Sequence, residues 1–234
     1  MKRSMNQLAG SSLYFGMLVS VGAYLFGLWL RKKTGLAILN PLLVAIILII
    51  AFLSAFHINY EEYNRGAGFL SYFLTPATVC LAIPLYRQLE LLKKNLVAVG
   101  TAILAGVAGS AGSIFVMSKA FGLEHAHYVT LLPKSITTAI GMGVSEEAGG
   151  IVTLTVVSII ITGILGNIIA DWLFGILKIE EPMAKGLALG TAAHAIGTAR
   201  ALELGEIEGA MSSLAIAVSG LLTVLVVPLV SGLI

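Results

Sequence analysis

Residues 209–234 read GAMSSLAIAVSGLLTVLVVPLVSGLI and contain no ionisable side chain. A run of about 20 apolar residues is long enough for a helix to cross the roughly 30 Å hydrocarbon core of a bilayer. Other uncharged blocks of comparable length occupy Leu13–Leu30, Leu36–Phe56, Phe69–Tyr86, Asn95–Ser118 and Ala148–Ala170. Two shorter blocks each contain one ionisable residue: Lys134 in Tyr128–Val144 and His194 in Gly186–Ala199. These blocks predict an all-α protein, a polytopic transmembrane helix bundle of seven or eight membrane elements.

The composition supports a protein embedded in a bilayer. Of the 234 residues, 58% are hydrophobic and 11% are charged, whereas soluble domains carry about 25% charged residues. The formal net charge of +2 gives no reason to expect a nucleic-acid partner. Cys80 is the only cysteine, so no disulfide can form within the chain. We expect residues 1–234 to form a single integral membrane domain whose first apolar block is retained as a helix rather than cleaved as a signal peptide.

Two passages centred on proline resemble each other. Residues 76–83 read PATVCLAI and residues 133–140 read PKSITTAI, each with a hydroxyl two positions after the proline. Proline removes a backbone donor and opens a helix, and irregular backbone at membrane depth is tolerated mainly beside a protein-lined cavity. Transporters use paired interrupted helices in this way. We therefore expect two Pro-interrupted segments that meet near mid-membrane, with Thr78 opposite Ser135; two ordinary proline kinks are the alternative.

Lys134 is an unusual residue for its surroundings. It lies between apolar residues, and a lysine at the centre of a membrane helix costs roughly 2.5–3.5 kcal/mol on insertion scales. The hydroxyls of Ser135, Thr137 and Thr138 follow it closely. A cation, several donors and an opened helix end together favour a site for a carboxylate. In the alternative interpretation, Lys134 lies near the membrane interface and extends its ammonium to water.

The segment around His194 consists almost entirely of small residues, which leave room for more than side chains. Thr198 comes four residues after His194, so the two share a face of a helix. Histidine titrates near neutrality, and His194 is therefore a candidate proton carrier. A buried, hydrogen-bonded structural histidine is the alternative. A zinc site is not expected, because no cluster of ligands accompanies His194.

The sequence resembles the LrgB/CidB family of bacterial membrane proteins, which includes the C-terminal half of the plant plastidial glycolate/glycerate transporter. The resemblance covers nearly the whole chain. Its marks are Asn40-Pro41-Leu42-Leu43, the stretch from Pro76 to Tyr86, Leu132-Pro133-Lys134-Ser135 with Thr137-Thr138, Gly190-Thr191 through His194 to Gly197-Thr198-Ala199, and the acidic Glu203/Glu206/Glu208 stretch before Gly209-Ala210. The sequence departs from the family pattern at Ala139-Ile140-Gly141, where a proline would be expected after the paired threonines.

The resemblance implies two competing functions. Bacterial members of the family are described as antiholin- or holin-like modulators of murein hydrolase activity and autolysis, acting with a small LrgA/CidA-type membrane partner. Other members move small carboxylates such as glycolate, glycerate or pyruvate. Either function implies a multi-pass protein of the bacterial cell membrane.

The residues favour transport, because a holin needs association and a pore but no buried lysine among hydroxyls. The expected substrate-binding residues are Thr78, Lys134, Ser135, Thr137, Thr138, His194 and Thr198. The expected partners are a small monocarboxylate, the LrgA/CidA-type protein, the lipid bilayer and further copies of this chain in a homo-oligomer, with no cofactor and no metal. An intramembrane enzyme is poorly supported, because no nucleophile–base pair stands out. The main alternative is a regulator that controls its partner without transport of its own.

Overall fold

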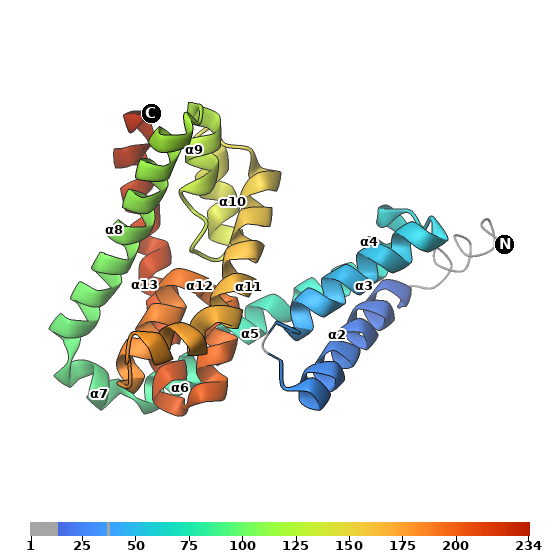
Figure 1. The fold of residues 1–234 in the computed structure, drawn as a ribbon, viewed down its shortest axis with the longest axis horizontal. Coiled ribbons are helices and arrows are strands. Elements are labelled where there is room, and N and C mark those ends of the chain that lie inside the picture. The colour runs from blue at the N-terminus through green and yellow to red at the C-terminus, as the bar shows by residue number, and fades with distance from the viewer. Residues whose placement is uncertain (1–13, 37) are drawn as a thin grey trace. The chain divides into compact units, whose positions relative to one another are not determined.

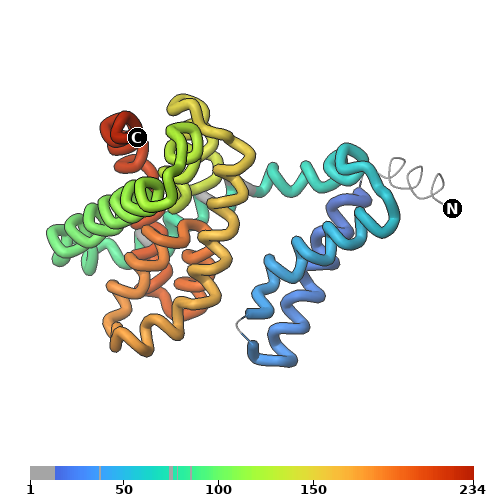
Figure 2. Tube along the Cα trace, turned by 45° about the horizontal axis from the view of Figure 1, so that its top comes forward, coloured from blue at the N-terminus to red at the C-terminus, as the bar shows by residue number. Residues whose placement is uncertain are grey.

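The computed structural model describes residues 14–36 and 38–234, except for the side chains of Leu74, Thr75, Thr78 and Leu85. The described residues are predominantly helical and contain no β-strand, which confirms the expected all-α class. The chain divides into two compact units, Met1–Cys80 and Leu81–Ile234, and each is described by itself. Figures 1 and 2 trace the helices of both units.

The longest of the described helices lie in the second unit. The first unit contains α2 (Phe15–Thr34), α3 (Pro41–Phe56), α4 (Tyr60–Ala67), the 3₁₀ helix η1 (Gly68–Phe73) and α5 (Leu74–Cys80). The second contains α6 (Ala82–Arg87), α7 (Leu89–Lys94), α8 (Leu96–Phe121), α9 (His125–Leu131), α10 (Thr138–Glu147), α11 (Val152–Ile176), α12 (Pro182–Leu204), α13 (Glu206–Val230) and η2 (Ser231–Leu233).

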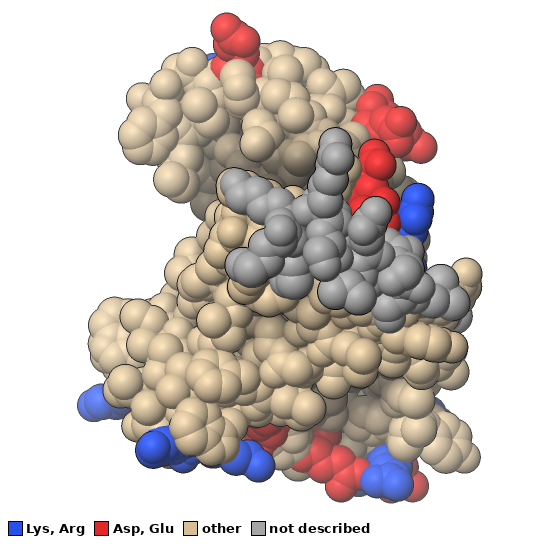
Figure 3. Space-filling model, turned by 90° about the vertical axis from the view of Figure 1, so that its right-hand side faces the viewer, with Lys and Arg blue, Asp and Glu red and all other residues tan. Residues whose placement is uncertain are grey.

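Three of the described helical stretches are long and apolar enough to cross a membrane: Leu96–Phe121, Val152–Ile176 and Glu206–Leu233. Pro41–Phe56 is a shorter apolar helix. The expected number of seven or eight membrane elements is therefore not confirmed. Most of the surface visible in Figure 3 is uncharged, as a surface that faces lipid would be.

The block Phe69–Tyr86 was expected to form one membrane element, and in the structure it does not. The chain passes through η1 and α5, turns at Leu81 and continues as α6. Pro84 explains the turn, because it lacks the N–H that a continuous helix would direct at the carbonyl of Cys80, four residues earlier. The interruption of this segment is thus centred on its second proline rather than on Pro76.

In the first unit, α2 and α3 form a helical pair whose connection is built from local signals. The side chain of Asn40 caps α3 by accepting hydrogen bonds from the backbone N–H groups of Leu42 at 2.9 Å and Leu43 at 3.3 Å. Pro41 occupies the first helical turn, where its missing N–H has no helical partner to lose. Gly27 of α2 lies so close to Pro41 that a Cβ there would be 2.7 Å from the Pro41 carbonyl oxygen. The Asn40-Pro41-Leu42-Leu43 mark is therefore explained by helix capping and close packing.

In the second unit, α8, α11 and α13 run between two opposite ends, as Figure 1 shows. At one end, the start of α13 meets α6 through an ion pair between Glu206 and Arg87 at 3.5 Å. At the other end, the last residues of α13 meet α9, where the Tyr128 hydroxyl donates to the Val230 carbonyl at 3.0 Å. The chain thus crosses the unit in α8, returns in α11 and crosses again in α13.

Helices α9 and α10 form a hairpin that enters this unit from one end and leaves at the same end. The side chain of Thr130, in α9, accepts a hydrogen bond at 2.7 Å from the backbone N–H of Ile151, which follows α10. Thr155, at the start of α11, donates to the Thr130 carbonyl at 3.0 Å, and its hydroxyl oxygen lies 2.6 Å from the Ser145 hydroxyl, which donates to it. The chain has therefore come back beside α9 before α11 begins. The turn between them, residues 132–137, is the first hairpin tip.

Helix α12 forms a second hairpin, from the opposite end, because it folds back at His194. That residue has φ 42° and ψ −135°, which no α-helix contains. A Cβ on Gly197 would collide with the carbonyl oxygen of Leu189, eight residues earlier, whereas in a straight helix the two lie about 12 Å apart along the axis. The returning half reaches α11 again, where Arg200 pairs with Asp171. The two halves, residues 182–193 and 195–204, each rise about 15–18 Å, which is roughly half of a bilayer core.

The second unit therefore contains the same structural motif twice, in opposite directions. A crossing helix is followed by a hairpin in α8 with α9–α10, and again in α11 with α12. Such inverted pairs, with interrupted helices that end near the bilayer midplane, are the architecture of many secondary transporters. Small residues let these elements approach closely: a Cβ on Gly190 would be 2.5 Å from the Ser212 carbonyl oxygen of α13.

Candidate functional site

The first hairpin tip forms because Pro133 ends α9. Pro133 has no N–H, so it cannot form the next helical hydrogen bond, to the carbonyl of Val129 four residues earlier. The last helical residue of α9 is Leu131, and the next helix begins at Thr138, with Thr137 in an extended conformation before it. The expected interruption at Pro133 is confirmed. It leaves Lys134 and Ser135 at the tip.

Ser135 receives two hydrogen bonds at this tip. The Lys134 ammonium donates to Ser135 Oγ at 3.1 Å, and the Ser110 hydroxyl of α8 donates to the same oxygen at 3.1 Å. A serine oxygen has two acceptor positions and one proton to donate. Since both acceptor positions are occupied, Ser135 can still donate a hydrogen bond through its own proton. Lys134 is half-buried and Ser135 is buried, with 6% of its surface exposed.

A small cavity opens beside Ser135 in the interior of the unit. Its polar lining consists of hydroxyls from four elements: Ser110 of α8, Ser135 of the first tip, Thr191 of α12, and Ser219 and Thr223 of α13. The remaining lining is aliphatic. The cavity measures about 10 Å³, which is the space of about one water molecule. The two hairpins thus meet at a hydroxyl-lined cavity that two crossing helices complete.

Thr137 and Thr138 begin α10 beside the cavity rather than in its lining. The Thr137 carbonyl accepts the first helical hydrogen bond, from the Gly141 N–H at 2.8 Å. The N–H groups of the preceding residues in the first turn of α10 have no partner within that helix. A helix start of this kind carries a partial positive charge. The tip therefore combines an ammonium, a serine donor and a helix N-terminus.

His194 lies at the second tip and faces α11. Its side chain is buried, and its Nε2 atom lies 2.9 Å from the carbonyl oxygen of Ile159. A carbonyl oxygen only accepts, so Nε2 carries a proton and Nδ1 is the atom at which a further proton would bind. Gly163 provides the space, because a Cβ there would be 2.8 Å from both Cε1 and Nε2 of the imidazole.

The close packing of His194 against Gly163 can be tested by substitution. We expect Gly163→Ala to lower the free energy of unfolding by about 1–3 kcal/mol, because the new methyl group overpacks the imidazole and its contact with Ile159. The matched control is Gly175→Ala in the same helix, where a Cβ would meet nothing within 4 Å. That control should be neutral or stabilising by up to about 1 kcal/mol. Thermal unfolding of the two purified variants measures the difference in stability between them. Equal stability would contradict the close packing of His194 against Gly163.

Thr198 joins the second hairpin to α13. Its hydroxyl donates to the His194 carbonyl at 3.0 Å and lies 2.7 Å from the Ser212 hydroxyl. Because Thr198 has only one proton, Ser212 is the donor in the second hydrogen bond. Thr198 is buried and holds the tip region of α12 against α13.

The structure thus places the expected site residues in two groups. Lys134 and Ser135 meet at the first tip, with Thr137 and Thr138 directly after them. His194 and Thr198 make contacts with α11 and α13 near the second tip, and Thr191 is the residue of α12 that reaches the hydroxyl-lined cavity. The side chain of Thr78 lies outside the described residues, so its expected place opposite Ser135 stays a prediction.

Four hydroxyl-bearing residues of the cavity lining were not among the expected site residues: Ser110, Thr191, Ser219 and Thr223. A signal for two of them was present, because Ser219 and Thr223 are four apart and share a face of α13. Ser110 lies among many small residues of α8 and carries no comparable signal. Within the described part of the chain, no three His, Cys, Asp or Glu side chains gather in a way that could hold a metal ion.

This arrangement defines an integral membrane protein with two opposed helical hairpins, which both contribute hydroxyls to one internal cavity. Comparison with known proteins gives the family. The chain belongs to the LrgB-like family, whose model matches residues 20–233. It is 42% identical over 217 residues to the antiholin-like protein LrgB of Bacillus cereus (strain B4264) and equally so to that of Bacillus anthracis (strain CDC 684 / NRRL 3495), covering 92% of this chain and 94% of each relative.

Family membership and the three long apolar helices make the chain a multi-pass protein of the bacterial cell membrane. Both relatives carry the name antiholin-like protein LrgB. No solved structure matches the chain.

Proposed function

We propose that this protein carries small monocarboxylates of the glycolate, glycerate or pyruvate class across the membrane, and binds them at the hairpin tips. The observation that supports this most is the state of Ser135, whose oxygen is occupied by two donors and whose proton is free for an anion. Lys134 supplies the charge that complements a carboxylate. The N-terminus of α10, with Thr137 and Thr138, adds backbone donors next to them.

The opposed hairpins provide a path for alternating access. The cavity holds about one water molecule and is smaller than any of these carboxylates, so a tip must move to admit one. Because the hairpins enter from opposite ends, movement of the first tip opens the site to one side and movement of the second opens it to the other. His194, with Nδ1 available for a proton, is the proposed proton carrier of the second tip.

A second function is favoured by the relatives, which are named antiholin-like. In that function the chain would modulate murein hydrolase activity and autolysis together with a small LrgA/CidA-type membrane protein, and further copies of itself. The two functions are compatible, because a change in carboxylate or proton balance would reach autolysis indirectly. Regulation without transport is the competing proposal.

Uptake by proteoliposomes tests the proposal. Vesicles containing the purified full chain and unlabelled pyruvate inside should accumulate labelled pyruvate from outside by exchange, with and without the small partner protein. Labelled glycerol, which is neutral, is the control solute and should not accumulate. Absence of pyruvate, glycolate and glycerate exchange in vesicles with and without the partner would contradict transport and leave regulation as the function.

A further inference from the structure

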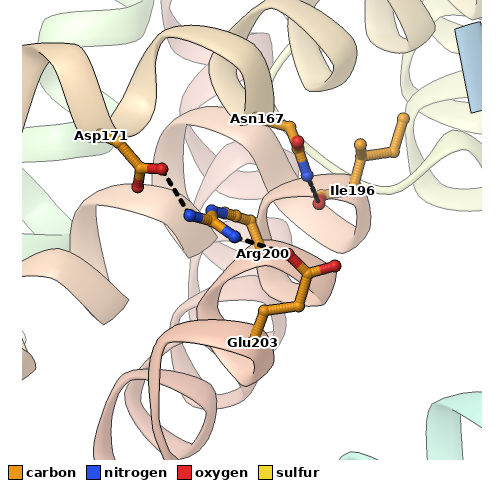
Figure 4. A network of polar contacts seen from close by, with 5 residues as sticks. All are labelled: Asn167, Asp171, Ile196, Arg200 and Glu203. Carbon is orange, nitrogen blue, oxygen red and sulfur yellow. Dashed lines mark hydrogen bonds and ion pairs between the residues drawn. The ribbon is translucent and has the colours of Figure 1, made fainter. Parts of the chain in front are cut away.

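Arg200 forms a polar network at the open end of the α12 hairpin, far along the returning half from the tip at His194 (Figure 4). Its guanidinium donates to Glu203 Oε2 at 2.6 Å and forms an ion pair with Asp171 Oδ2. The Arg200 side chain is 17% exposed, whereas the side chains of Asp171 and Glu203 are 52% and 49% exposed. The cation is thus shielded and both carboxylates reach toward the surface.

The network joins two elements in a fixed register. Asp171 belongs to α11 and Arg200 to the returning half of α12. One turn earlier in each helix, the side-chain amide of Asn167 donates to the Ile196 carbonyl at 3.1 Å. The two contacts therefore connect positions that are four residues apart on both helices, as Figure 4 shows. Two contacts one turn apart prevent the returning half from sliding or rotating along α11.

This register determines where the second tip lies. The returning half begins after His194 and contains Thr198, and both of these residues hold the tip to its neighbours. The contact between Arg200 and Glu203, three residues apart, lies within the same half. Of the two ion pairs of Arg200, the one with Asp171 crosses between elements and helps to hold the half as a body.

We infer that Arg200 is a positioning residue, which clamps the returning half of α12 to Asp171 of α11 and so sets the place of the second hairpin tip. A guanidinium suits this role, because it can serve two carboxylates at once in a planar geometry. The inference about tip position stands on the contacts alone. Its effect on carboxylate binding rests on the proposed function.

The clamp predicts a difference between the two carboxylates that merely local stabilisation of α12 would not produce. In a Cys80→Ser background, nitroxide labels at Ile161 of α11 and Leu202 of the returning half, both exposed, report the distance between the elements. We expect Asp171→Asn and Arg200→Gln to broaden or shift the distance distribution. Glu203→Gln should leave it unchanged. The exchange Asp171→Arg with Arg200→Asp keeps the net charge and should restore the narrow distribution.

Equal effects of Asp171→Asn and Glu203→Gln, or no effect of either, would overturn the clamp. Failure of Arg200→Gln to fold would leave the comparison of Asp171→Asn with Glu203→Gln intact, because both carboxylate side chains are about half exposed and tolerate neutral isosteres. Calorimetry with pyruvate adds the functional readout: Asp171→Asn should weaken binding by about five- to tenfold and Glu203→Gln should not. If the parent protein binds no pyruvate, the proposed function fails while the distance measurement still decides the clamp.

Discussion

Lys134→Ala is expected to lose carboxylate binding by roughly 30-fold or more, because truncation of one partner of a buried charge pair costs at least about 2 kcal/mol. The ammonium is the described cation closest to Ser135, and its hydrogen bond to that residue would disappear with it. The protein should remain folded and inserted, since a lysine inside a membrane opposes insertion rather than assisting it. Calorimetry with pyruvate on the purified variant measures the affinity, and thermal unfolding tests whether the variant is still stably folded.

Lys185→Ala is the matched control, because it removes the same charge from the first turn of α12. It should bind pyruvate like the parent protein. A Lys134→Gln variant, which keeps a donor without the charge, should bind weakly as well. Unchanged pyruvate affinity in both Lys134 variants would exclude the tip as the carboxylate site, and Lys134 would then be a lysine that extends its ammonium to water.

Much of the fold follows from features that the sequence displays directly. The block at 209–234 became α13, and those at 95–118 and 148–170 became α8 and α11, because an uncharged run of this length has few other stable forms in a bilayer. The interruption at Pro133 could also be predicted, because proline acts through its own missing N–H. These are local causes, and local causes can be inferred from single residues.

The second interruption has no such local cause. Nothing in Gly190–Ala199 forbids a straight helix, and the spacing of His194 and Thr198 was interpreted as one face of such a helix. The turn at His194 depends instead on contacts with other elements, in which Gly163 admits the imidazole and Ser212 holds Thr198. The shared cavity of the Pro133 hairpin and the α12 hairpin therefore became visible only in three dimensions. The ion pair of Arg200 with Asp171, 29 residues apart, was inaccessible for the same reason.

The fold-back of α12 itself can be tested by one methyl group on Gly197. In a straight helix, Gly197→Ala would stabilise the protein by up to about 1 kcal/mol, because alanine is the better helix former. In the hairpin, the new Cβ would collide with the Leu189 carbonyl oxygen and lie 2.7 Å from Ala193 Cβ. Both neighbours belong to the backbone or its first side-chain atom and cannot rotate away. We therefore expect the opposite sign, a loss of about 3 kcal/mol or more in the free energy of unfolding.

The matched control for Gly197→Ala is Gly109→Ala in α8, where a Cβ would meet nothing within 4 Å. This control should behave as the straight-helix case and be neutral or slightly stabilised. Thermal unfolding and the yield of monodisperse protein after extraction show whether each variant is more or less stable than the parent protein. A Gly197→Ala protein as stable as the Gly109→Ala protein would mean that α12 continues straight through His194. The second tip would then not exist, and alternating access would lose the element that closes one of its two sides.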